Sequence, residues 1–274
     1  MLTALRLETD HLVDFQRDGV VCIRGAIDTH WVATLARGLA ENEADPSPYG
    51  RRKMAEALQD GGFFDDYNNW RRIEAYREFV YHSPAAAMVT GLMGSRTAVF
   101  YHEHVLVKFP GAQRATPWHH DQTYYPVRGS HTCSLWIPLD PVPAESALRF
   151  VAGSHRWGRL FMPRTFRDAA DYPLEDQGAP LESVPDIDAH PERYELRSWA
   201  MEPGDCLVFH MLTLHGAPGN PCQDRRRRAV ATRWFGDDAR FVARPWEISP
   251  EETGGLQPGQ PMACTAFPRI WPAP

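Results

Sequence analysis

Short segments in the second half of the chain alternate between apolar and polar residues. The longest is AVFYHEHVLVKF, from residue 98, and it is followed by TCSLWIPL, LRFV, YELRSW, DCLVFH and AVATRWF. A period of two in segments rich in β-branched and aromatic residues is typical of strands. Since no helical pattern separates these segments, we expect antiparallel strands in a double-sheet barrel and not a parallel βαβ sheet.

The first hundred residues show helical periodicity instead. A short strand is predicted at 18–24, and Asp28 or Thr29 can cap the helix that follows. Apolar residues recur every four positions from Trp31 to Leu39, so this helix is expected to bury one stripe.

A second helix is predicted at 83–93. Ser83 is the expected cap, Pro84 occupies the first position and Gly94 stands just beyond the end. Segment 45–70, rich in Pro, Gly, Asp and Asn, is predicted as a loop. Segment 162–194 is predicted as a long insertion between strands, of the kind that forms a functional loop or a lid.

Composition and charge narrow the class of protein. Hydrophobic residues make up 43% of the 274 residues and aromatic residues 11%, as in an ordinary globular protein. The net charge of −6 argues against a nucleic-acid partner, because binding to phosphates needs clustered Lys and Arg. No window of about 18 apolar residues occurs, so a membrane span is not expected.

The cysteines and the start of the chain indicate a compartment. The five cysteines are odd in number and form no CxxC pair, which fits a reducing environment. The first fifteen residues carry acidic side chains and lack the basic start and apolar stretch of a signal peptide. We therefore expect a cytoplasmic protein.

Candidate metal chemistry lies in the segment TPWHHDQ at 116–122. On a strand, residues i and i+2 point to one face, so His119 and Asp121 can bind one ion while His120 points away. One more imidazole would complete a set of two histidines and one carboxylate, which leaves three positions open on iron(II). His215, within FHMLTLHGAPGN, is the candidate.

Seven segments follow one another along the chain: FQRDGVVCIRG, VLVKFPG, PWHHDQ, LWIPLD, LRFVAGSHRWG, MEPGDCLVFH and LHGAPGN. In this order they resemble the phytanoyl-CoA dioxygenase family, a branch of the iron and 2-oxoglutarate oxygenases, from about residue 14 to 240. The resemblance implies an all-β core with flanking helices, folded as a double-stranded β-helix, the cupin-like jelly roll. We expect one domain over 1–274, with the jelly-roll core at about 98–240 and a helical flank at 1–97.

The resemblance also implies the site and the reaction. The family's metal ligands fall on His119, Asp121 and His215, and the implied cofactors are iron(II), 2-oxoglutarate and O₂. The implied reaction is hydroxylation of a small organic molecule with release of succinate and CO₂. Related halogenases replace the carboxylate ligand by a small residue, so the presence of Asp121 favours hydroxylation.

The far carboxylate of 2-oxoglutarate needs a fixed cation, and the planar fork of arginine suits a carboxylate. In the family this arginine follows the second histidine by about a dozen residues, where this chain has the run at 225–228. Strand alternation places Arg227 on the face of Ala229, which favours Arg227. Arg226 is the second choice and Arg233 the third.

Other residues are candidates for the walls of the site. Ser134 and Trp136 share a strand face and could line the cosubstrate pocket, although Trp136 suits a plain core equally. Lys108 is a candidate anion contact. Tyr124 and Tyr125 follow the metal strand and could face the substrate or pack within a loop.

The remaining histidines are expected to be structural. His102 and His104 share one strand face, but the following VLVKFPG lacks the Glu that a cupin would add, so they are structural or cosubstrate neighbours. His210 lies five residues before His215, which places the two on opposite strand faces and predicts packing or capping for His210. His155 lies in a turn whose role is expected to be structural.

Three alternative functions stay open at this point. The same iron centre could epimerise, cyclise or desaturate its substrate. A metal-dependent barrel could bind a small ligand without turnover. A zinc hydrolase could use the same ligands, but the arginine for a dicarboxylate would then lack a role.

Overall fold

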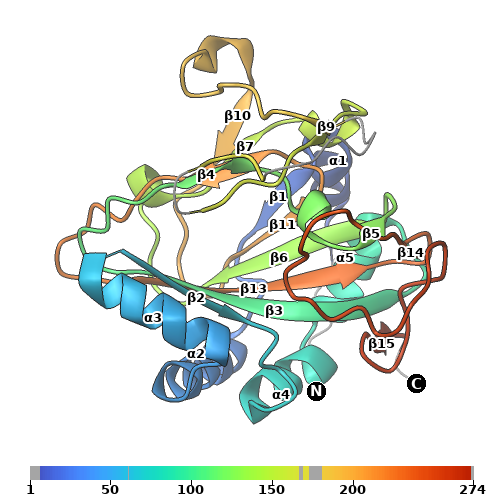
Figure 1. The fold of residues 1–274 in the computed structure, drawn as a ribbon, viewed down its shortest axis with the longest axis horizontal. Coiled ribbons are helices and arrows are strands. Elements are labelled where there is room, and N and C mark those ends of the chain that lie inside the picture. Colours follow the sequence, from blue (N-terminus) through green and yellow to red (C-terminus); the bar gives the residue numbers. More distant parts are fainter. Residues whose placement is uncertain (1–6, 61, 167–168, 173–180, 273–274) are drawn as a thin grey trace.

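Two antiparallel sheets face each other in the protein, and most of the helices lie on one side of them (Figure 1). The structure, a computed structural model, describes residues 7–60, 62–166, 169–172 and 181–272. The predicted double-sheet core of antiparallel strands is confirmed.

The large sheet has the strand order β1-β11-β6-β13-β3-β15, and β2 pairs with β3 beside that path. Its strands are β1 (Val20–Ile23), β2 (Phe63–Tyr67), β3 (Ala98–Lys108), β6 (Thr132–Pro138), β11 (Cys206–His210), β13 (Arg227–Phe235) and β15 (Arg269–Trp271). The sheet therefore takes strands from the predicted helical flank, β1 and β2, and from the C-terminal part of the chain, β15.

The small sheet has the order β10-β7-β12-β4. Its strands are β4 (Thr116–His119), β7 (Arg149–Val151), β10 (Leu196–Ser198) and β12 (His215–Ala217). Two short pairs lie outside both sheets: β5 (Val127–Arg128) with β14 (Arg240–Phe241), and β8 (Leu160–Phe161) with β9 (Leu181–Glu182).

Five α-helices and four 3₁₀ turns are present among the described residues. The helices are α1 (Thr9–Asp18), α2 (Thr29–Ala44), α3 (Pro48–Asp60), α4 (Glu74–His82) and α5 (Ala85–Met93). The 3₁₀ turns are η1 (Asp121–Tyr124), η2 (Ala144–Ser146), η3 (Ser154–Arg156) and η4 (Pro191–Arg193).

Each face of the large sheet buries a separate apolar cluster. On β13, Val230 and Trp234 pack with the helices, while Ala229 and Ala231 point between the two sheets. Between the sheets these small side chains meet larger ones, among them Trp136, Phe150 and Phe209. Alternation along the strand thus serves the helical layer on one face and the barrel interior on the other.

The two predicted helices are confirmed, with one change at a cap. Asp28 caps α2 by accepting a hydrogen bond from the Trp31 N–H at 3.0 Å. The second predicted helix is α5, which ends at Gly94 in the left-handed conformation, as expected. Pro84 stands at the cap position itself, and Ser83 assists by accepting from the Ala85 N–H.

The prediction of a loop over residues 45–70 is wrong, because this segment forms α3 and β2. Ser47 accepts a hydrogen bond from the Gly50 N–H, so Ser47 and Pro48 form a regular helix start that the composition concealed. Asp is unfavourable in strands, but both acidic residues of β2 are bonded by neighbouring side chains. Tertiary contacts therefore override the local preference.

The predicted insertion at 162–194 is described only in part, since residues 167–168 and 173–180 lie outside the described residues. Within it, β9 pairs with β8 and Arg164 forms an ion pair with Asp171 at 3.0 Å. Residues 1–6, at the start of the segment weighed as a signal peptide, also lie outside the described part.

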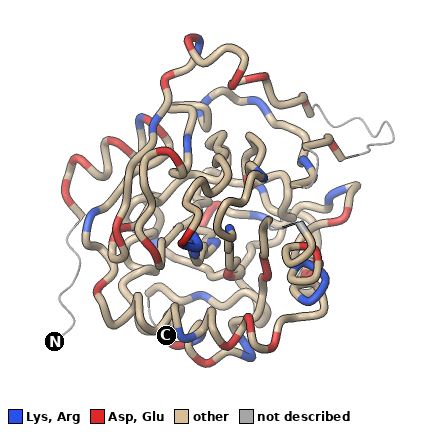
Figure 2. Tube along the Cα trace, turned by 90° about the vertical axis from the view of Figure 1, so that its left-hand side faces the viewer, with Lys and Arg blue, Asp and Glu red and all other residues tan. Residues whose placement is uncertain are grey.

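Acidic and basic residues are interspersed along the chain trace (Figure 2). Within the basic run at 225–228, Arg226 and Arg228 form ion pairs with nearby carboxylates, whereas Arg227 is buried. Among the described helices, none combines the length and the apolar character that a membrane crossing requires.

Truncating a buried side chain of the helical layer is expected to destabilise the protein strongly. Phe79 of α4 is fully buried in the cluster that joins the helices to the sheet. We expect Phe79→Ala to lower the free energy of unfolding by about 3–5 kcal/mol, since it leaves a cavity. Leu58→Ala, at a side chain that is 71% exposed, should change it by less than about 0.5 kcal/mol. Urea denaturation measures both, and equal effects would contradict the assigned packing.

Candidate metal centre

Two histidines and one aspartate converge between the sheets. His119 ends β4, His215 begins β12, and the two are directly paired in the register of the small sheet. One ligand atom from each of His119, Asp121 and His215 lies within 4.8 Å of the others. The structure thus brings together the three residues expected from the sequence.

Asp121 reaches the histidines by a route that differs from the expected one. The strand β4 ends at His119, and Asp121 is the first residue of η1, not the next inward position of a strand. Its Oδ1 lies 3.6 Å from Nε2 of His119 and 3.8 Å from Nε2 of His215. His120 points away, and its Nε2 accepts from the Phe161 N–H.

Both imidazoles are held in the tautomer that exposes Nε2. Nδ1 of His119 donates to the Pro117 carbonyl at 2.8 Å, and Nδ1 of His215 donates to the Thr213 carbonyl at 3.0 Å. Each bond fixes the proton on Nδ1 and leaves a lone pair on Nε2. Burial lowers the pKa of His215 to about 3, so this imidazole is neutral.

The Asp121 carboxylate uses its two oxygens differently. Its Oδ2 accepts from Oγ of Ser134 at 2.6 Å and lies 3.1 Å from Nε of Arg233. Burial opposes ionisation, but the charge of Arg233 outweighs it and holds the pKa of Asp121 well below its usual value. Oδ1 is thereby turned towards the imidazoles as an ionised ligand atom.

This donor set fits a divalent metal. Three buried atoms with lone pairs face one another, an arrangement that is costly unless a cation lies between them. Two imidazoles and a single carboxylate are the set that leaves open positions on iron(II).

A cavity of about 850 Å³ opens beside these residues and extends to Arg227. Arg227 is 7% exposed and donates to the Ser146 carbonyl, and it forms no ion pair with any described carboxylate. Burial lowers the pKa of this guanidinium to about 10, so it stays charged at neutral pH. Trp136, Leu148 and Phe209 form apolar walls around it. An unpaired buried cation of this kind suits an anionic ligand.

Three residues expected at the cosubstrate are placed elsewhere. Nζ of Lys108 is bonded to the carbonyls of Arg114, Ala217 and Pro218. Arg226 pairs with Glu43, and Ser134 holds the metal carboxylate, so neither is among the cavity-lining residues. The polar groups of these three residues are occupied by other partners in this structure, and their role at the cosubstrate stays a prediction.

The third arginine candidate lines the cavity but is already paired. Arg233 contacts Asp121, and its Nε donates to the Tyr125 hydroxyl at 3.0 Å. Tyr124 and Tyr125 both line the cavity, and the Tyr124 hydroxyl donates to the Arg164 carbonyl at 2.8 Å. Tyr124 thereby fastens the start of the insertion beside His119, whose ring lies 5.6 Å away.

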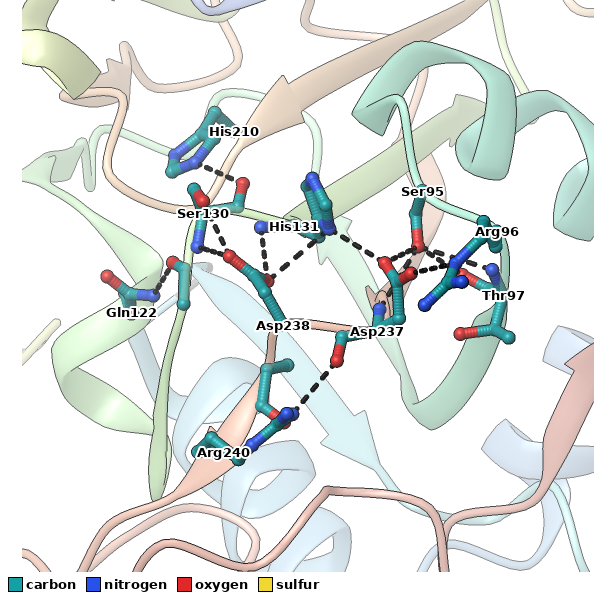
Figure 3. A network of polar contacts seen from close by, with 12 residues as sticks. Ser95, Arg96, Thr97, Gln122, Ser130, His131, His210, Asp237, Asp238 and Arg240 are labelled. Carbon is teal, nitrogen blue, oxygen red and sulfur yellow. Dashed lines mark hydrogen bonds and ion pairs between the residues drawn. The ribbon is translucent and has the colours of Figure 1, made fainter.

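The other histidines have structural partners, as expected. Nε2 of His210 donates to the Ser130 carbonyl at 2.8 Å (Figure 3). Its Nδ1 accepts from the Leu212 N–H. Asp238 accepts from the Ser130 and His131 N–H groups, which anchors the same loop (Figure 3). This network fixes the turn that leads from β11 into the His215 strand. His102 and His104 line the cavity, outside the metal set.

The sequence interpretation missed one wall of the cavity. Tyr49 of α3, with Asp65 and Tyr67 of β2, lines it, as does Trp246 beyond the last matched motif. Two signals were available: the Ser-Pro helix start, and the alternation of Phe63, Asp65 and Tyr67 within FFDDY.

A double-sheet barrel with this metal set and a buried unpaired arginine defines a non-haem iron enzyme that depends on 2-oxoglutarate and O₂. The family model described as phytanoyl-CoA dioxygenase matches residues 15–229, and the chain belongs to this family. The predictions of the jelly-roll fold, the enzyme class and the cofactors are confirmed. The non-catalytic barrel and the zinc hydrolase do not fit this membership.

Individual relatives are distant but extensive. The multifunctional dioxygenase ausE of Aspergillus calidoustus is 24% identical over 239 residues, 79% of this chain and 69% of the relative. The carbocyclase SnoK from nogalamycin biosynthesis superposes with a TM-score of 0.73 at 21% identity, covering 97% of this chain and 98% of that chain.

The epimerase SnoN, in complex with Fe³⁺, alpha ketoglutarate (2-oxoglutarate) and nogalamycin RO, superposes with a TM-score of 0.71 at 20% identity. The match covers 95% of this chain and 97% of that chain. At this identity the likeness shows the shared fold.

The contact between Ser134 and the carboxylate predicts an effect on metal binding. We expect Ser134→Ala to weaken binding of iron(II) or cobalt(II) by about 10–100-fold, since Oδ2 loses one of its two partners. Thr132→Val is the matched control, because this hydroxyl on the same strand has no partner among the described residues. Anaerobic metal titration compares the two, and an unchanged affinity in Ser134→Ala would contradict the orienting role.

Proposed function

We propose that this chain is an iron(II)- and 2-oxoglutarate-dependent dioxygenase that hydroxylates a small organic molecule, with His119, Asp121 and His215 as the metal ligands. The observation that carries the proposal is the convergence of two Nε2 atoms and one carboxylate oxygen beside an open cavity. The presence of the Asp121 carboxylate supports hydroxylation over halogenation.

When bound, iron supplies the redox chemistry that couples decarboxylation of 2-oxoglutarate and reduction of O₂ to oxidation of the substrate. The residues of this chain provide orientation. The carbonyls of Pro117 and Thr213 fix the imidazole tautomers, and Ser134 with Arg233 fixes the carboxylate.

We assign Arg227 to the far carboxylate of 2-oxoglutarate. Of the buried guanidinium groups that line the cavity, Arg227 is the one without a carboxylate partner among the described residues, and apolar side chains line the same cavity. In such surroundings a charge-assisted pair excludes water and aligns the cosubstrate along the barrel. Trp136 would form the wall beside it.

Epimerisation or cyclisation is the second candidate outcome. An epimerase and a carbocyclase share this fold over nearly the whole chain, and the cavity is roomy beyond the metal ligands. Product analysis distinguishes the outcomes, since hydroxylation adds an oxygen atom, cyclisation or desaturation removes two hydrogens and epimerisation leaves the composition unchanged.

We further propose that residues 1–274 act as one unit, because the large sheet recruits β1, β2 and β15 from both sides of the jelly-roll strands. A cytoplasmic location is proposed on the five free cysteines, none of which is disulfide-bonded. A small-molecule substrate is proposed because the cavity has a volume of about 850 Å³.

The metal assignment predicts a spectroscopic signal and its loss. Anaerobic addition of iron(II) and 2-oxoglutarate to the folded protein should give a weak visible charge-transfer band. His119→Ala and Asp121→Ala should abolish both this band and succinate formation while far-UV circular dichroism stays unchanged, since each removes one ligand. Unchanged turnover in either variant would refute the assignment.

The cosubstrate assignment predicts a contrast between neighbouring arginines. Arg227→Ala should raise the KM for 2-oxoglutarate roughly 100-fold or more, because the pair with a charged group is lost. Arg226→Ala, which removes a cation bound to Glu43 outside the cavity, should leave this KM within about twofold. Uncoupled succinate formation measures both values, and the reverse order would move the assignment to Arg226.

A further inference from the structure

One wall of the cavity, on the side formed by β2 and β3, carries a buried carboxylate. Phe63, Asp65 and Tyr67 alternate onto the inner face of β2, and Asp65 is paired in register with Leu106 of β3. The helix α3 lies beside this edge of the sheet and contributes Tyr49 (Figure 1). The side chain of Asp65 is 7% exposed.

Both donors to Asp65 bind the same oxygen. The Tyr49 hydroxyl donates to Oδ2 at 2.7 Å, and Nε2 of His104 lies 3.0 Å from Oδ2. Burial and then the charge of Asp65 raise the pKa of Tyr49, so the phenol keeps its proton and remains a donor. Among the described residues none donates to Oδ1, which stays available as an acceptor inside the cavity.

Aromatic rings surround the space between this carboxylate and the metal ligands. The rings of Tyr49 and Tyr67 lie 4.5 Å apart on the Asp65 side, and Phe166 lies 4.8 Å from the His119 ring on the metal side. Tyr172 and Trp246 also line the cavity. Flat, apolar walls of this kind favour a ring-shaped ligand.

The charges around Asp65 indicate which kind of ligand group could donate a hydrogen bond to it. Arg52 and Lys53 of α3 line the cavity and lie 5.8 and 5.6 Å from the centre of the Tyr49 ring. Glu247 and Glu251 line the same cavity, so charges of both signs face it. An ammonium group would meet the cations that lie over the Tyr49 ring, and a carboxylate would meet Asp65 and the two glutamates. A neutral donor, a hydroxyl group, satisfies both conditions.

We propose that Oδ1 of Asp65 accepts a hydrogen bond from a hydroxyl group of a neutral, ring-containing substrate and so orients that substrate towards the metal. The inference rests on the proposed function, since it assigns this end of the same cavity to the substrate. Asp65 is here a specificity-determining residue, held by Tyr49 and His104.

A binding experiment tests this without turnover. Isothermal titration calorimetry of the full chain, with and without anaerobic iron(II) and 2-oxoglutarate, compares 2-naphthol with 2-methoxynaphthalene, which lacks the donor. We expect 2-naphthol to bind roughly tenfold more tightly, as one hydrogen bond to a charged acceptor provides. Equal affinity, or no binding of either probe, would overturn the proposal.

Asp65→Asn probes the acceptor itself. The amide can keep its oxygen towards Tyr49 and His104, which turns its NH₂ group into the cavity as a donor. In Asp65→Asn the affinity for 2-naphthol divided by that for 2-methoxynaphthalene should fall to one or below. Asp10→Asn, in the exposed first turn of α1, should retain the ratio of the unchanged protein. A preference that persists in Asp65→Asn would contradict the role of Oδ1.

Two further measurements keep the test decisive. If Asp65→Asn does not fold, Tyr67→Leu should weaken both probes by a similar factor and keep the preference, and unchanged binding would contradict the ring-lined site. 2-Naphthylmethylammonium should bind less tightly than 2-naphthol, and tighter binding would overturn the choice of a neutral donor. These affinities are independent of succinate formation, so failure of the proposed reaction is distinguishable from failure of this inference.

Discussion

The proposed metal centre depends on the Asp121 carboxylate, because its two oxygens contact different partners. Oδ2 of Asp121 is held from the large sheet, by Ser134 of β6 and Arg233 of β13, while Oδ1 faces imidazoles that the small sheet supplies. Because the partners come from both sheets, the ligand set exists only when the sheets are packed together. Without Arg233 a buried negative charge would stand near no fixed cation, which is costly in a protein interior.

Two arginines on the inner face of β13 differ in whether a carboxylate is paired with them, and this difference separates their roles. Arg233 and Arg227 are both buried and both line the cavity. Arg233 is neutralised by Asp121, whereas Arg227 has no carboxylate among the described residues and lies within apolar walls. The first therefore supports the metal ligand, and the second remains available to an anion that enters from outside. The small residues between them, Ala229 and Ala231, leave room for that anion.

The substrate side of the cavity is built around the two acidic residues of β2. Asp66 points away from the cavity, where Asn42 and Ser47 bind its carboxylate and secure the start of α3. Asp65 points inward, where Tyr49 and His104 hold one oxygen and leave the other. Strand alternation thus makes one aspartate a structural anchor of the helix and the other a polar point in an otherwise aromatic wall.

The sequence by itself determined the strands of the core and the capped helices α2 and α5, because alternation and caps are local patterns. It also indicated the three proposed metal ligands, through the His-x-Asp spacing together with the order of the family motifs. It also narrowed the cosubstrate arginine to a short run. Only the tertiary structure showed which of Arg226, Arg227 and Arg233 are paired with a carboxylate, and only it revealed Asp65 in a segment that composition assigned to a loop. The physical reason is that burial and partnership of a charge depend on groups distant in sequence, such as Glu43 for Arg226 and Asp121 for Arg233, which no local pattern encodes.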